Sequence, residues 1–199
     1  MSARIVRWVM AAGLVVGATL VVVLSQRLTR LTHAYQVLQR RASTLTTGEV
    51  VPTFQAVTLT GDTLTVGERL DGGKQVLLLL TTTCPFCRAT LPVWAQLADS
   101  IRQVRPDVEV IAVSLDSLDA TRRYAEEQGM AMPVVTVPTR KLVRLLRAGR
   151  VPQTVVVNHE GRVLYGWAGL LSAQAVLDSI LIAVTAAPSA VPVDSASGS

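Results

Sequence analysis

Residues 81–92 read TTTCPFCRATLP and contain both cysteines of the 199-residue chain, Cys84 and Cys87. The run just before them, Gln75 to Leu80, is short and almost wholly apolar, which is typical of a strand buried on both faces. After them, to about Val104, apolar side chains recur at helical spacing. The two cysteines are therefore expected where a buried strand ends and a helix begins.

This position predicts redox chemistry. A helix N-terminus offers a favourable dipole and unpaired N–H groups, which stabilise a thiolate at Cys84. Cys87, one turn further along, can then close a disulfide with it. Pro85 suits the first turn, where its missing N–H costs nothing. A redox-active Cys84–Cys87 disulfide is expected, with no separate cofactor.

A metal site is an alternative use of two cysteines. A structural zinc site takes four ligands, and besides the two cysteines this chain offers two histidines, His33 and His159. His33 falls in a helical segment near the N-terminus and His159 in a turn between two strands. No metal ligand set is predicted, and metal delivery or inert structural thiols stay as alternatives.

The N-terminal region resembles a membrane anchor. Residues 8–26 are 19 uncharged positions, or roughly 28 Å of helix, close to the hydrocarbon thickness of a bilayer. The run ends VVVLSQR and lacks the small residues of a signal-peptide cleavage site. We expect an uncleaved single-pass transmembrane helix after a short tail, residues 1–7. Arginines flank both ends, so charge alone leaves the orientation open.

Residues 27–46 are predicted to form a helical stalk. From Leu24 to Leu45, apolar residues recur at alternating spacings of four and three, a heptad pattern. Its alternatives are a homodimer through the stalk and a single amphipathic helix. Six arginines are the only charged residues before position 46. The chain beyond it contains 13 basic and 14 acidic residues. The folded part is nearly neutral, and no nucleic-acid partner is expected.

The remaining elements predict an α/β domain over residues 47–187 with a mixed sheet flanked by helices. A β-hairpin is expected at its start, and residues 188–199, rich in Pro and Ser, form a disordered tail. The expected elements, in chain order, are strands Gln55–Leu59, Thr63–Val66, Gln75–Leu80 and Val108–Leu115, helix Leu118–Gln128, strand Val134–Val137, helix Thr139–Ala148, strands Thr154–Val157 and Arg162–Trp167, and a helix from a Ser172 cap to about Ala186.

Three marks together resemble a thioredoxin-like fold: CPFC after a buried strand, Pro92 eight residues past the first cysteine, and the sequence VPQT at 151–154 before a hairpin. The leading segment and the extra region 116–138 resemble membrane-anchored thioredoxin-like proteins of the TlpA and ResA type. The resemblance covers about residues 48–186. It implies catalytic Cys84 and Cys87, a cis Pro152 facing them, and backbone at Val151 and Pro152 that binds a partner chain, with supporting roles for Pro85, Phe86 and Pro92.

The same resemblance implies a location and partners. It places the chain in the cytoplasmic (inner) membrane, with its domain on the extracytoplasmic or periplasmic side. The expected partners are protein thiols and disulfides, a membrane electron donor, and the lipid bilayer through residues 8–26. The two residues between the cysteines include no histidine, which favours a reductase or isomerase over a strong oxidant.

Departures from the family pattern leave further alternatives. Thr83 replaces the tryptophan usual before the first cysteine, and the strand Val76 to Leu80 lacks the buried acid of thioredoxins. Thr81 stands three residues before Cys84 as in peroxiredoxins, which suggests a peroxidase, but Leu77 replaces their proline. The basic helix before Pro152 is either a solvated face or a docking surface for an acidic partner.

Overall fold

The computed structural model describes residues 8, 17, 19–27, 29, 44–137, 139–171 and 174–186. The chain divides into two compact units, one on each side of residues 42–43. In the first unit, residues 19–27 are helical and exposed. No helix within the described ranges is both long and apolar enough to cross a membrane. About half of the predicted anchor (8–26) and most of the predicted stalk (27–46) fall outside the described residues, and both terminal tails (1–7 and 188–199) fall wholly outside them.

The second unit is built on a mixed five-stranded sheet. Strand β3 is its centre, paired in parallel with β4 and antiparallel with β6. All six residues of β3 are buried, as their apolar sequence predicts. The strands, in the order in which they lie across the sheet, are β5 (Val134–Thr136), β4 (Glu109–Ser114), β3 (Gln75–Leu80), β6 (Gln153–Val157) and β7 (Val163–Ala168).

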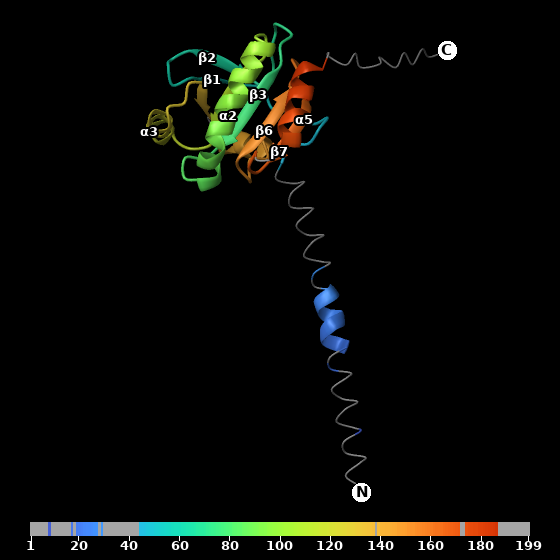
Figure 1. Cartoon of the computed structure of the whole chain (residues 1–199). Coiled ribbons are helices and arrows are strands. Elements are labelled where there is room, and N and C mark those ends of the chain that lie inside the picture. Colours follow the sequence, from blue (N-terminus) through green and yellow to red (C-terminus); the bar gives the residue numbers. More distant parts are fainter. Residues whose placement is uncertain are drawn as a thin grey trace, which may run out of the picture. The chain divides into compact units, whose positions relative to one another are not determined.

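Alternate residues of β3 supply two separate cores. Val76, Leu78 and Leu80 face a layer formed by α2 (Pro85–Val104), α3 (Leu118–Gln128) and α5 (Gln174–Thr185). Figure 1 shows α2 and α5 over the same face of the sheet. Leu77 and Leu79 face the opposite layer, where residues of a β-hairpin and the segment around Leu146 pack. The predicted α/β fold with a mixed sheet is confirmed.

The predicted N-terminal hairpin is also confirmed. Strands β1 (Phe54–Val57) and β2 (Thr63–Val66) form a two-stranded antiparallel sheet of their own. Gly61 allows the turn between them because it has a positive φ of 101°. The amide of Leu59 donates to the carbonyl of Val134 at 3.1 Å, which ties the hairpin to the edge strand β5.

Two predictions of local structure were wrong. The basic helix was expected over Thr139–Ala148, but α4 covers only Arg140–Leu145. Arg147 has a φ of 46°, outside the right-handed helical region, and the chain turns there to bury Leu146 and Ala148. Leu45, assigned to the stalk by its heptad spacing, is instead buried in the core beside the hairpin. The expected cap Ser172 lies outside the described residues.

Candidate active site

Cys84 is the residue immediately before α2 and is partly exposed. Its Sγ accepts a hydrogen bond from the backbone N–H of Cys87, at 3.4 Å, and so caps the helix. The same Sγ donates to the carbonyl oxygen of Val151 at 3.7 Å. Pro85 occupies the first turn of α2, as its missing N–H predicts. The sulfur thus lies at a helix N-terminus, accessible from one side.

Cys87 differs sharply from Cys84, because its side chain is fully buried. Burial raises the pKa of the Cys87 thiol to about 12, and the nearby Cys84 and Asp116 act in the same direction. At neutral pH this thiol is therefore protonated. Both cysteines are free thiols in this structure. The site pairs one accessible sulfur with one buried sulfur three residues later.

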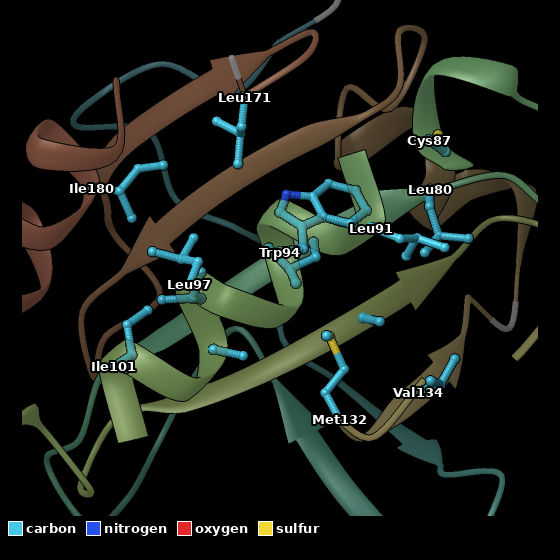
Figure 2. Close-up of a cluster of buried hydrophobic side chains, with 14 of the residues drawn as sticks. Leu80, Cys87, Leu91, Trp94, Leu97, Ile101, Met132, Val134, Leu171 and Ile180 are labelled. Carbon is cyan, nitrogen blue, oxygen red and sulfur yellow. The ribbon is translucent and has the colours of Figure 1, made fainter. Parts of the chain in front are cut away.

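The hydrophobic core explains why Cys87 is buried. Figure 2 shows Cys87 beside Leu80 and Leu91, at one end of the cluster under α2. Further along the helix, the fully buried Trp94 donates from Nε1 to the Thr154 hydroxyl on β6, at 2.9 Å. This bond satisfies a polar group in the core and fixes α2 against the sheet. Rolling α2 to bring Cys87 towards solvent would break this bond and expose the buried side chains.

The loop before β6 contacts Cys84, although it lies 67 residues further along the chain. The Val151–Pro152 peptide bond is cis, as predicted, and Pro152 is buried. The carbonyl of Pro152 accepts a hydrogen bond from the backbone N–H of Gly169 at 2.8 Å, which continues the pairing of β6 and β7 by one residue beyond the strand ends. Val151 contacts the Cys84 sulfur through its own carbonyl. The structure therefore brings together Cys84, Cys87, Val151 and Pro152, although they are widely separated in the sequence.

The other predicted site residues, Phe86 and Pro92, lie on α2. Phe86 lies in the first turn of α2, and its side chain is 58% exposed. Pro92 is exposed, and α2 continues through it as a single helix. Its missing N–H leaves the carbonyl of Arg88 without the usual helical donor. Pro92 therefore removes one backbone hydrogen bond from α2 without ending the helix.

Sequence reasoning missed Asp116, which holds the loop that carries Cys84. Its Oδ2 accepts hydrogen bonds from the backbone N–H of Thr82 at 2.6 Å and from the Thr82 hydroxyl at 2.8 Å. The cause is the parallel register that pairs Leu80 of β3 with Ser114 of β4, since both strands end at the same edge. An acid directly after the predicted strand Val108–Leu115 was a signal available in the sequence.

Tyr124 was also missed, and it lies on α3 close to the cysteines. Its side chain is only 4% exposed, and burial raises the pKa of its hydroxyl, with the charge of Cys87 acting in the same direction. Nearby Arg88 acts in the opposite direction. A buried phenol beside the buried thiol adds to the apolar, weakly solvated surroundings of Cys87.

No cluster of three or more metal-binding side chains occurs in the parts of the chain that the structure describes. His159 lies in the β6–β7 turn, partly exposed, with its Nε2 3.8 Å from a carboxylate oxygen of Glu160. His33 is outside the described residues.

Comparison with known proteins agrees with this fold. The sequence model of the AhpC/TSA family matches residues 47–165. A search of curated protein sequences found no match. Among solved structures, a protein assigned as thiol:disulfide interchange protein DsbE from Chlorobium tepidum aligns with a TM-score of 0.60 and 23% identity, over 70% of this chain and 99% of its own.

Two further structures align in the same way. StoA from Bacillus subtilis has a TM-score of 0.56 and 18% identity, over 66% of this chain and 98% of its own. DsbF from Mycobacterium tuberculosis, solved in mixed oxidised and reduced forms, has a TM-score of 0.54 and 24% identity, over 65% and 94%. These similarities establish a thioredoxin-like fold.

Proposed function

Because the chain belongs to the AhpC/TSA family, we propose that it is a thiol-disulfide oxidoreductase that exchanges disulfides with protein partners through Cys84 and Cys87. One observation carries the proposal: an accessible sulfur at a helix N-terminus is paired with a buried, protonated thiol one turn later. The backbone N–H of Cys87 already contacts the Cys84 sulfur, so the two residues are close enough to form a disulfide with little movement.

In the reducing direction, the Cys84 thiolate attacks one sulfur of a partner disulfide. The partner S–S bond breaks, a mixed disulfide forms, and the other partner sulfur leaves as a thiolate. Cys87 then loses its proton and attacks the sulfur of Cys84, which releases the second partner thiolate. The partner has gained two electrons, and the pair is oxidised to a Cys84–Cys87 disulfide. A dithiol donor must reduce that disulfide before another cycle.

The different environments of the two thiols assign their roles. Cys84 meets the partner because it is the accessible sulfur, while buried Cys87 can reach only Cys84. The high pKa of Cys87 makes the second step slow, and a bound mixed disulfide is therefore long-lived. A long-lived mixed disulfide suits isomerisation, in which the partner chain rearranges while it is attached, and the absence of histidine between the cysteines favours a reductase or isomerase over a strong oxidant.

The proposal includes a place in the cell. The uncharged run at residues 8–26 would tether the chain to the inner membrane, with the domain on the extracytoplasmic side and a membrane electron donor to restore the dithiol. A reporter that is active only outside the cytoplasm, fused after Ala186, tests this orientation. Activity of a cytoplasmic reporter at the same position would contradict it.

The catalytic roles are tested by trapping. The Cys87→Ser chain should accumulate mixed disulfides with partner proteins, visible as bands that disappear on reduction, and Cys84→Ser should form none. Trapping by Cys84→Ser instead would reverse the roles. If neither variant traps and the wild-type pair never cycles with dithiothreitol, the oxidoreductase proposal fails and a binding or metal-delivery role remains.

A peroxidase is the second candidate, since Thr81 stands three residues before Cys84 as in peroxiredoxins. The Cys84 thiolate would attack a hydroperoxide oxygen, forming a sulfenic acid and releasing the alcohol or water, and Cys87 would then expel water to form the disulfide. Hydrogen peroxide consumption by the reduced chain separates the candidates. Oxidation by peroxide faster than by a peptide disulfide would favour the peroxidase.

A further inference from the structure

The segment that leads into Pro152 has a strongly unbalanced charge. Five of the thirteen basic residues after position 46 fall within residues 140–150, and this segment contains no acidic residue. The rest of the chain beyond position 46 then has eight basic residues against fourteen acidic ones. The domain is nearly neutral as a whole, yet one short segment has nearly two-fifths of its positive charge.

The backbone of this segment is held in place. Leu146 and Ala148 are buried in the core beside the hairpin. The buried side chain of Gln153 donates from Nε2 to the carbonyls of Arg147, at 3.0 Å, and Arg150, at 2.6 Å. Arg147 also forms an ion pair with Glu49 at 2.7 Å. The segment is therefore a fixed part of the domain surface.

Four of the cations are exposed: Arg140, Lys141, Arg144 and Arg150, here called the basic surface. None of them forms an ion pair with a carboxylate in the described part of the chain. Arg140 and Arg144 are one turn apart on α4, and Lys141 is three residues before Arg144, so these three share a side of the helix. The charge of the basic surface is not neutralised within the domain.

One residue of the basic surface, Arg150, lies next to the loop that contacts the Cys84 sulfur. Arg150 precedes Val151, whose carbonyl accepts from Cys84 Sγ, and successive Cα atoms lie only about 3.8 Å apart. Phe86, two residues after Cys84, has an exposed apolar ring. A chain whose disulfide reaches Cys84 must therefore pass near Arg150.

We propose that the basic surface selects protein substrates with acidic residues next to the reactive disulfide; this rests on the proposed function. A protein segment fits better than a lipid surface, because headgroups bound this close to Cys84 would cover the sulfur that must react. Complementary charge raises encounter rates by about 10- to 1,000-fold at low ionic strength, and salt screens the effect. The basic surface thus determines which substrates bind near Cys84, and the cysteines reduce the substrate disulfide.

The test uses the reduced full-length chain in neutral detergent micelles. Three peptides of equal length each contain one internal disulfide, flanked by Asp, Ser or Lys residues, and the rate of their reduction is measured by chromatography. The test variant is Arg140→Gln/Arg144→Gln/Arg150→Gln, which includes the cation nearest to Cys84. The control, Arg102→Gln/Arg122→Gln/Arg123→Gln, removes the same charge from exposed positions on α2 and α3. Arg102 is about 27 Å along α2 from Cys84.

We expect the Asp peptide to react at least tenfold faster than the Ser peptide at low salt, and the Lys peptide to react slowest. The advantage should largely disappear in 0.5 M salt and in the test variant, but persist in the control. Equal rates for all three peptides, or equal losses in both variants, would overturn the proposal. Reduction of no peptide at all would instead reject the oxidoreductase function.

A lipid role for the same surface gives a different result. Phosphatidylglycerol vesicles would then bind the wild-type chain and the control more tightly than the test variant, and the Asp peptide would have no advantage. That combination would assign the basic surface to anionic membranes and overturn the protein-substrate proposal.

Discussion

The buried thiol of Cys87 should make the stability of the domain depend on pH. Its pKa is raised from 9.0 to about 12, so the folded state holds the proton more tightly than the unfolded chain does. The stabilisation is fully present below pH 9 and is lost as the pH rises towards 12. Between pH 8 and 10.5 the loss from this group is about 2 kcal/mol, or 1.5 pH units at about 1.36 kcal/mol each.

The measurement is urea unfolding of the full-length chain at several pH values, with a phosphine reductant to keep both thiols free. Other groups also titrate here, so the relevant quantity is the difference in unfolding free energy between wild type and Cys87→Ala. That difference should shrink by about 2 kcal/mol from pH 8 to 10.5. In a Cys84→Ser background this dependence on pH should persist, because burial of Cys87, and not the neighbouring Cys84, is the largest cause of its raised pKa.

A pH-independent difference between wild type and Cys87→Ala would refute this reasoning. It would mean that the Cys87 thiol ionises as easily in the folded domain as in the unfolded chain. The argument for a slow second step in disulfide exchange would then also fail, because it depends on the same protonated thiol.

Three further predictions concern the framework of the site. Thr154→Val should lower the free energy of unfolding by about 1–3 kcal/mol, because it leaves the buried Trp94 N–H unpaired; Thr154→Ser, which keeps the hydroxyl, is the control in the same urea titration. Asp116→Asn keeps an acceptor for Thr82 but removes a charge that raises the pKa of Cys87, so in the chain with Cys87 intact a mixed disulfide formed at Cys84 should be released faster, as followed by gel electrophoresis; unchanged release would contradict the assignment. Lys74→Met should cost about 1–3 kcal/mol in thermal unfolding, because Lys74 Nζ donates to the last carbonyls of α5, including those of Ala183 and Val184 at 2.9 Å; Arg102→Met, which loses only an exposed pair with Asp99, should cost under about 1 kcal/mol.

Local sequence determined most of the elements, since the signals that set them lie within each segment. The apolar run Gln75–Leu80 became β3 with the predicted bounds, because a strand buried on both faces needs no alternation. The helix Leu118–Gln128 also has its predicted bounds, with Ser117 capping its start and Gly129 closing it at a φ of 61°. The buried strand and the helical pattern on either side of the cysteines likewise placed Cys84 at the start of the helix, where it is the N-cap of α2.

The tertiary structure decided which distant residues meet the sulfur atoms. The parallel register of β3 and β4 places Asp116 against Thr82, and the sheet order brings the Val151 carbonyl to Cys84. Neither contact follows from local pattern, because each depends on how strands far apart in sequence are aligned. The end of α4 was misjudged for the same reason. Leu146 and Ala148 are both buried because the backbone leaves the helical conformation at Arg147. The helix propensities of residues 139–148 do not predict this, because it depends on packing against residues elsewhere in the chain.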